Sequence, residues 1–169
     1  MVQDGRQKGV PLKTVYGENT EQPFLKVKGR WFITLYGPDG EIKEYREGNN
    51  VVTTVGKEFL ASFLKSAALA ASTFTMKYVA IGSDSTAEAA GNTTLGSELS
   101  RHTGTVSYVS NQIYRVTATF ATGSGTGSVV EYGLFSSNTA GTMFARDTEA
   151  VVNKGSNDTL TVTSEFTIS

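Results

Sequence analysis

The sequence predicts a mainly β protein, an antiparallel β-sandwich or small barrel with one helix (about 55–69) and an extended N-terminal arm. Two observations indicate this class. The 169 residues include 18 glycines and only 18% charged residues, which suits short strands joined by glycine-containing turns. From residue 75 onward, apolar side chains recur with a period of two between regularly spaced turns, so about seven or eight short strands are expected.

The chain is expected to form one β-rich domain over residues 25–169, preceded by an extended arm over residues 1–24. Its mass of 18.0 kDa fits one domain that buries roughly two thirds of the surface of the unfolded chain. The arm has scattered charges and no sustained apolar period. It is either a solvated tail or a segment that lies along a neighbouring subunit. In the second case its contact residues would be Val10, Leu12, Val15 and Tyr16.

A hairpin is predicted over residues 25–47. Its two strands flank the turn Gly37-Pro38-Asp39-Gly40, in which the proline and the second glycine suit a type I turn. Gly29 interrupts the first strand at a point where a bulge or a close backbone approach would fit. The apolar side of this strand is formed by Val27, Trp31, Ile33 and Leu35.

The predicted helix, about 55–69, has apolar side chains on one face and lysines on the other. Thr53 or Thr54 is the expected N-cap. We expect the helix to cover one end of the core. The apolar face is formed by Phe59, Leu60, Phe63, Leu64 and Ala67.

The remaining strands are predicted at 76–81, 106–120 (a hairpin around residues 111–112), 128–135, 142–146 and 159–168. The last strand alternates most clearly, with Leu160, Val162, Phe166 and Ile168 on one face and mostly threonines on the other. Such alternation indicates one buried face and one solvated face.

Composition also bears on partners and cofactors. The net charge of −1 gives no basic surface for a phosphate backbone, so no nucleic-acid partner is expected. Cysteine is absent, which excludes disulfides, thiolate metal sites and thiol nucleophiles. No apolar run reaches the ~18 residues of a membrane span, so no membrane partner is expected either.

No catalytic site, cofactor or metal is predicted. The one histidine, His102, is expected in a surface loop, and no serine lies in a Gly-x-Ser-x-Gly sequence. Loop 82–92 has oxygen ligands but lacks the aspartate spacing of an EF-hand, so calcium has only weak support. The carboxylates are expected to point outward from the sheet rather than to form a glycosidase pair. Those considered are Glu98, Glu131, Asp147, Glu149 and Glu165.

Several segments resemble a widespread group of small structural proteins of tailed bacteriophages. The resemblance covers about residues 50–169. It is carried by Lys77-Tyr78-Val79-Ala80-Ile81-Gly82-Ser83, Thr93-Thr94-Leu95-Gly96-Ser97-Glu98, Glu131-Tyr132-Gly133-Leu134-Phe135, Met143-Phe144-Ala145-Arg146 and 152–162.

The resemblance implies a virion component that is assembled in the bacterial cytoplasm. Enzymatic activity is not expected, because the residues provide no catalytic site. The leading hypothesis is a capsid decoration or cement protein that contacts the major capsid protein and forms a homo-oligomer, either a trimer or another cyclic form. The alternative is a tail, baseplate or fibre-attachment protein. A carbohydrate-binding module is a third hypothesis, which requires Tyr108, Tyr114 and Tyr132 to face outward, whereas at least two of them are expected inside.

Overall fold

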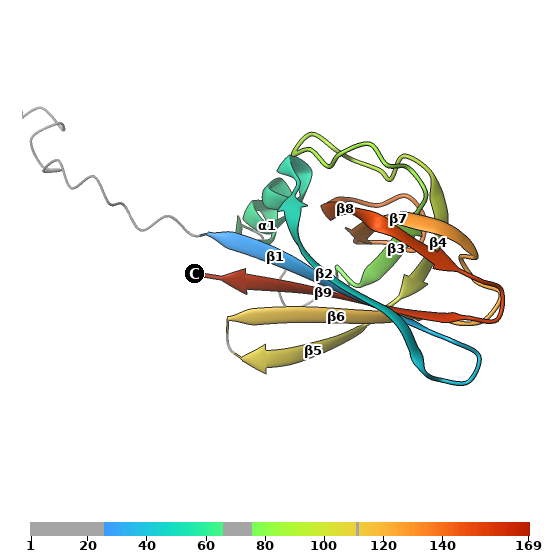
Figure 1. Cartoon of the computed structure of the whole chain (residues 1–169). Coiled ribbons are helices and arrows are strands. Elements are labelled where there is room, and N and C mark those ends of the chain that lie inside the picture. Colours follow the sequence, from blue (N-terminus) through green and yellow to red (C-terminus); the bar gives the residue numbers. More distant parts are fainter. Residues whose placement is uncertain (1–25, 66–75, 111) are drawn as a thin grey trace, which may run out of the picture.

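The computed structural model describes residues 26–65, 76–110 and 112–169. This part of the chain forms one antiparallel sheet of nine strands and one helix. The sheet is nearly closed into a barrel (Figure 1), which confirms the predicted fold class. The elements are β1 (Val27–Tyr36), β2 (Ile42–Val52), α1 (Thr54–Lys65), β3 (Tyr78–Gly82), β4 (Glu98–Thr103), β5 (Thr105–Ser110), β6 (Ile113–Phe120), β7 (Gly127–Phe135), β8 (Met143–Lys154) and β9 (Thr159–Ile168).

The barrel is formed by a sheet with the strand order β4-β3-β7-β8-β2-β1-β9-β6-β5. The two outermost strands, β4 and β5, are consecutive in the chain and are separated by Gly104 alone. A Cβ atom at Gly104 would lie 2.5 Å from Val116 Cγ1, so this corner accepts only glycine without rearrangement. The chain itself therefore joins the two edges of the sheet at this corner.

The two ends of the barrel differ. Figure 1 shows α1, the start of β1 and the C-terminus at one end, and the β1–β2, β6–β7 and β8–β9 turns at the other. Lys26 N donates a hydrogen bond to Ser169 O (2.7 Å), and Ser169 N donates one to Lys26 O (3.0 Å). The chain therefore enters β1 in line with the strand, alongside the C-terminus.

The β1–β2 hairpin matches its prediction, although β2 is five residues longer, reaching Val52 instead of residue 47. Gly40 N donates to Gly37 O (3.0 Å), and Gly40 has a φ of 83°, a conformation that favours glycine. The close approach expected at Gly29 is present, but the side chain of Asn50 makes it. A Cβ atom at Gly29 would lie 1.9 Å from Asn50 Oδ1.

Helix α1 begins with the predicted threonine cap. Thr53 Oγ1 accepts a hydrogen bond from Gly56 N (3.0 Å), and its hydroxyl donates to Met143 O (2.6 Å). Gly56 allows the helix to contact β8 closely, because a Cβ atom there would lie 2.3 Å from Phe144 O. Phe59 packs against the core, as predicted for a helix that covers one end of the barrel. The predicted last turn, 66–69, lies outside the described residues.

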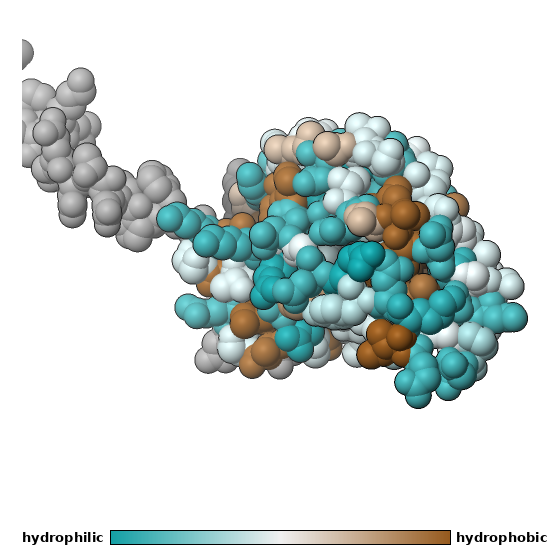
Figure 2. All heavy atoms as spheres, viewed as in Figure 1, coloured by the Kyte–Doolittle hydropathy of each residue, from teal (hydrophilic) through white to brown (hydrophobic). Residues whose placement is uncertain are grey.

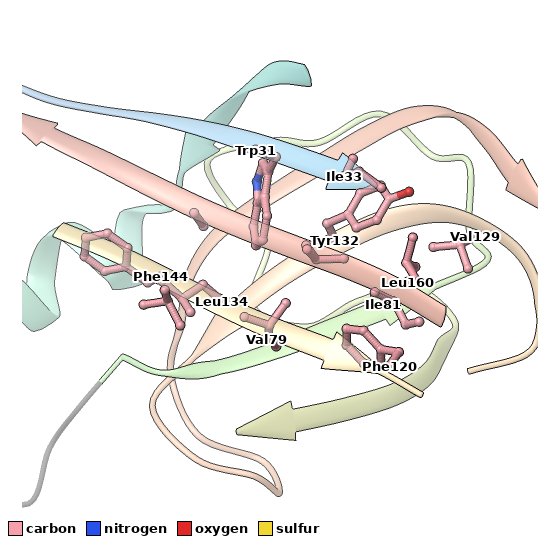
Figure 3. Packing of buried hydrophobic residues seen from close by; sticks show 14 of the residues in the cluster. Trp31, Ile33, Val79, Ile81, Phe120, Val129, Tyr132, Leu134, Phe144 and Leu160 are labelled. Carbon is pink, nitrogen blue, oxygen red and sulfur yellow. The ribbon is translucent and has the colours of Figure 1, made fainter. Parts of the chain in front are cut away.

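The core fills the space between the two walls with inward-facing side chains from eight strands and α1 (Figure 3). Trp31 and Tyr132 come from opposite walls, and their ring centroids lie 6.1 Å apart. The inward alternation predicted for the last strand is confirmed by Leu160, Val162 and Phe166, which are at most 1% exposed. The predicted core side of β1 is buried likewise, at Trp31, Ile33 and Leu35.

Two strand predictions were wrong. Residues 98–103, which include His102, form β4 rather than a loop. β4 is the edge strand next to β3, and its side chains make polar contacts, so it lacks an alternating apolar pattern. The strand predicted at 142–146 extends to Lys154, because its polar second half remains paired with β7.

Candidate functional site

Glu131 of β7 and Arg146 of β8 form an ion pair that is buried in the wall of the barrel. Arg146 NH2 and Nε lie 2.9 and 3.2 Å from Glu131 Oε2. Glu131 is 0% exposed and Arg146 is 2% exposed. The prediction that Glu131 points into solvent was wrong, because the loop between β3 and β4 covers this face of the sheet. A charge buried in this way is stable only when it is paired and hydrogen bonded.

The same ion pair holds the loop 83–97 against the barrel. Glu131 accepts hydrogen bonds from the backbone N–H groups of Asp84 (3.2 Å), Gly96 (2.9 Å) and Ser97 (2.7 Å). Arg146 NH1 donates to Asn92 Oδ1 at 3.2 Å. The loop therefore closes around one buried carboxylate, and Glu131 acts as a structural anchor.

A second polar cluster joins three turns at the other end of the barrel. Lys154 is 2% exposed, and its ammonium group donates to Ala121 O (3.0 Å) and Asp158 O (2.8 Å). Lys43 of β2 donates to Asp158 Oδ2 at 2.7 Å. This hydrogen bond, together with the one from Gly155 N, lowers the pKa of Asp158, and burial lowers the pKa of Lys154. The cluster fixes the β8–β9 turn to β2 and to the β6–β7 turn.

His102 connects β4 to the β6–β7 turn. Its Nδ1 lies 3.0 Å from Thr119 O, and its Nε2 lies 2.8 Å from Ser124 Oγ. Because a carbonyl only accepts, Nδ1 donates to Thr119 O. A serine and a histidine are thus within hydrogen-bond distance, but the group on Nδ1 is a carbonyl rather than the carboxylate of a triad. Ser124 Oγ also lies 3.1 Å from Ser100 Oγ, so the arrangement closes the edge of the barrel.

The wall of the barrel has a gap between β2 and β8. These strands pair only at Val51–Arg146 and Val52–Ala145, after which β2 follows β1 and β8 follows β7. Gly48 of β2 faces the interior because it lies opposite the buried Trp31. From β8, Asp147 faces inward opposite Tyr132. We call this gap the acidic window; it is lined by Glu44, Arg46, Gly48, Tyr132, Asp147 and Glu149.

Two carboxylates meet over Gly48. A Cβ atom at Gly48 would lie 1.7 Å from Glu149 Oε1 and 3.4 Å from Asp147 Oδ2. Because both distances start from one point, the two oxygens lie within about 5 Å of each other. The absence of a side chain at Gly48 leaves the space that the Glu149 carboxylate occupies. The expectation that Asp147 and Glu149 point outward near a strand end was therefore wrong.

Buried polar groups of the window have no hydrogen-bond partner. Asp147 is 2% exposed, and its Oδ2 is without a partner, as is the hydroxyl of the fully buried Tyr132. In Figure 3 the Tyr132 hydroxyl points away from Trp31 and toward Ile33, which is paired with Arg46 of β2. Unsatisfied acceptors inside a barrel are rare in native proteins and commonly mark a site that takes up a further group.

The electrostatic environment of the window is negative. Burial is the main cause that raises the pKa of Asp147 to about 7, and the nearby Glu149 and Glu88 raise it further. Burial and the charges of Asp147 and Glu149 likewise raise the pKa of Tyr132 far above its ordinary value. Two neighbouring carboxylates favour a shared proton or a cation between them.

The residues predicted as a partner-contact site, Val10, Leu12, Val15 and Tyr16, lie outside the described residues. Of the tyrosines considered for sugar binding, Tyr132 is buried, and Tyr114 packs against the core with its hydroxyl 2.6 Å from Met76 O. Sequence reasoning missed the acidic window, because its two walls are about 100 residues apart in the chain.

The loop proposed as a weak calcium candidate uses its oxygens internally. Asp84 Oδ1 accepts hydrogen bonds from the backbone N–H and the hydroxyl of Thr86 (3.0 and 2.9 Å), which lower the pKa of Asp84. Among residues 26–65, 76–110 and 112–169, no three histidine or carboxylate side chains are placed to hold a metal ion. In the same part of the chain, no helix has both the length and the apolar character of a membrane span.

Comparison of the chain with protein-family models, curated proteins and solved structures gave no match.

Proposed function

We propose that this chain is a structural component of a bacteriophage particle, most specifically a decoration or cement protein on the outside of the head. The observation that carries the proposal is the resemblance over residues 50–169, combined with the way in which the resembling residues are used in the barrel.

Three of the segments that carry the resemblance are far apart in sequence but meet in one cluster. Gly96 and Ser97 of the 93–98 segment donate to Glu131 of the 131–135 segment, which pairs with Arg146 of the 143–146 segment. The 152–162 segment supplies the second cluster, with Lys154 and Asp158. Because the resembling residues contact one another in the folded chain, the resemblance concerns the fold as well as the sequence. This supports membership of the same structural group.

The shape of the barrel suits attachment by one end. The start of β1, α1 and the C-terminus share one end, while three turns occupy the other (Figure 1). The surface seen in Figure 2 is mostly hydrophilic, with separate hydrophobic patches. Ile42, Tyr45 and Val151 are exposed apolar residues in or near the gap between β2 and β8. Few charges would have to be desolvated when such a surface meets another protein.

The fixed turns favour a rigid component over one that opens during a reaction cycle. Lys154 and Asp158 connect the turns at the free end, and Glu131 and Arg146 fix the long loop. Such locking suits a protein that binds many symmetric copies of a shell subunit in one geometry, because a preorganised surface loses little entropy on binding.

Binding to phage heads tests the proposal. Purified chain is mixed with shells that lack it, and co-sedimentation is measured before and after shell maturation. We expect saturable binding to shells at one of these stages. Absence of co-sedimentation at both stages, with a folded protein, would exclude the decoration role.

A tail component with the same fold would differ from a head decoration protein in copy number and symmetry. Binding to purified tails or baseplates, in place of heads, would assign the chain there instead. Binding to neither, accompanied by binding to host-surface polysaccharide, would favour the carbohydrate-binding hypothesis.

A further inference from the structure

The acidic window has the properties of a site for a cationic side chain. Asp147 Oδ2 and Glu149 Oε1 lie within about 5 Å of each other over Gly48, and Asp147 Oδ2 and the Tyr132 hydroxyl have no hydrogen-bond partner. Arg46 is the basic residue of the window, and its guanidinium is already paired with Glu44. A guanidinium or ammonium group entering here would supply donors to acceptors that have none.

The chemistry of the window favours an organic cation over a metal ion. In the part of the chain described by the structure, no three carboxylate or histidine groups are arranged for a metal. Two carboxylates and a hydroxyl instead match the several N–H donors of one arginine or lysine side chain. Beyond the two ladder pairs, the facing edges of β2 and β8 are not paired with each other, so an extended backbone can hydrogen bond beside the inserted side chain.

The chain contains a segment of complementary charge. Residues 5–17 include Arg6, Lys8 and Lys13 and no acidic residue, whereas residues 18–21 include two glutamates. A hollow of about 450 Å³ adjoins the window at the end of β2, and the two charged residues that line it are lysines. The order of charges in this segment, basic and then acidic, is therefore complementary to an acidic window followed by a hollow with two lysines. The hollow is lined by Val27, Lys28, Gly29, Asn49, Asn50, Val51, Val52, Lys57 and Ala90.

The length of the segment allows it to reach a neighbouring copy. The two hydrogen bonds between Lys26 and Ser169 fix the start of the described chain beside the C-terminus, at one end of the barrel. The twelve residues between Lys13 and Lys26 can span roughly 40 Å when extended, which is enough to reach an adjoining subunit.

We propose that residues 5–17 of a neighbouring copy dock at the acidic window, with one basic side chain held between the carboxylates of Asp147 and Glu149. The interaction links copies of the chain head to tail, so it closes into a ring when the rotation between copies allows it. This inference rests on the proposed function and adds to it the contact through which the homo-oligomer forms. It is tested on purified protein alone, so its failure leaves the head-binding proposal standing.

The first test measures self-association of the full chain by sedimentation velocity. Two variants should each weaken association by about tenfold or more, because each removes one side of a partly buried charge pair: Glu149→Gln, and the triple variant Arg6→Gln, Lys8→Gln, Lys13→Gln. The triple variant leaves the barrel sequence unchanged and so guards against an effect of misfolding. Glu41→Gln, on the exposed β1–β2 turn, is the matched control and should associate like the wild type.

The second test uses the natural absence of cysteine. In the double variant Leu12→Cys, Ala150→Cys, oxidation should give covalently linked dimers and larger species, because Ala150 is exposed beside Glu149. The control pair Leu12→Cys, Ser107→Cys places the second thiol on β5, outside the window, and should cross-link much more slowly.

Each possible outcome decides the proposal. A monomeric wild type, association unchanged in both charge variants, equal cross-linking of the two cysteine pairs, or linkage only within one chain would overturn it. Weaker association in both charge variants and intermolecular cross-links specific to residue 150 would support it.

Discussion

At the scale of single residues, several charged side chains are buried in the wall of the barrel, and their environments differ. Glu131 and Arg146 satisfy one another, whereas Asp147, on the next position of β8, has an oxygen without a partner. From the sequence alone, strand alternation predicted a polar outer face and could not reveal that the loop 83–97 covers it. The buried apolar positions Trp31, Ile33 and Leu35 were predictable, because they depend only on the period of their own strand.

Replacing Arg146 by methionine should destabilise the barrel by roughly 3–5 kcal/mol, because it leaves the charge of Glu131 buried without its partner. Urea unfolding followed by far-ultraviolet circular dichroism measures this change. Arg115→Met is the matched control, since Arg115 pairs with Glu165 at a site where its side chain is 37% exposed, and should cost less than about 1 kcal/mol. Equal losses in the two variants would contradict the structural role assigned to Arg146.

The stability of the protein should fall as the pH rises from about 4 to about 7. In the folded state the pKa of Asp147 is raised to about 7, whereas the unfolded chain has the ordinary value near 3.8. In this range the unfolded state binds fewer protons, so each rise in pH favours unfolding. One unit of pKa difference between the folded and unfolded states corresponds to about 1.4 kcal/mol. Asp147→Asn should therefore remove up to about 4 kcal/mol of the change in unfolding free energy across this pH range. Urea unfolding at pH 4.5 and pH 8 measures it, and an unchanged slope in the variant would count against a buried, unpaired Asp147.

At the scale of elements, the sequence was most informative where an element depends on local signals. The β1–β2 turn, the cap of α1 and the alternation of β9 were all predicted from nearby residues. β4 was missed and β8 was predicted too short, because both have polar side chains that contact other parts of the barrel. The acidic window was out of reach for the same reason, since it joins Gly48 to Glu149 across the sheet.

Thr53→Ala should destabilise the protein by about 2 kcal/mol. The change removes the N-cap of α1 and the hydroxyl bond to Met143 O, which together connect the helix to β8. Thermal unfolding measures the loss. The neighbouring exposed Thr54 is the matched control, and Thr54→Ala should change stability by less than about 0.5 kcal/mol. If both substitutions lowered the stability by a similar amount, Thr53 would not be the N-cap of α1.

At the scale of the whole molecule, a locked barrel follows a charged N-terminal segment in the chain. In the proposed assembly, the barrel is the rigid body that attaches by one end, and the segment connects neighbouring copies. Both features suit a protein that covers a symmetric shell, in which weak contacts repeated around each subunit add up to stable binding.

Quantitative mass spectrometry of purified virions, calibrated against the major capsid protein, tests the central claim most directly. We expect on the order of hundreds of copies per particle, in a fixed ratio to the capsid protein, as the symmetry of a closed shell requires. A few tens of copies or fewer would contradict a head decoration protein and indicate the tail, and absence from the virion would contradict a structural role in the particle.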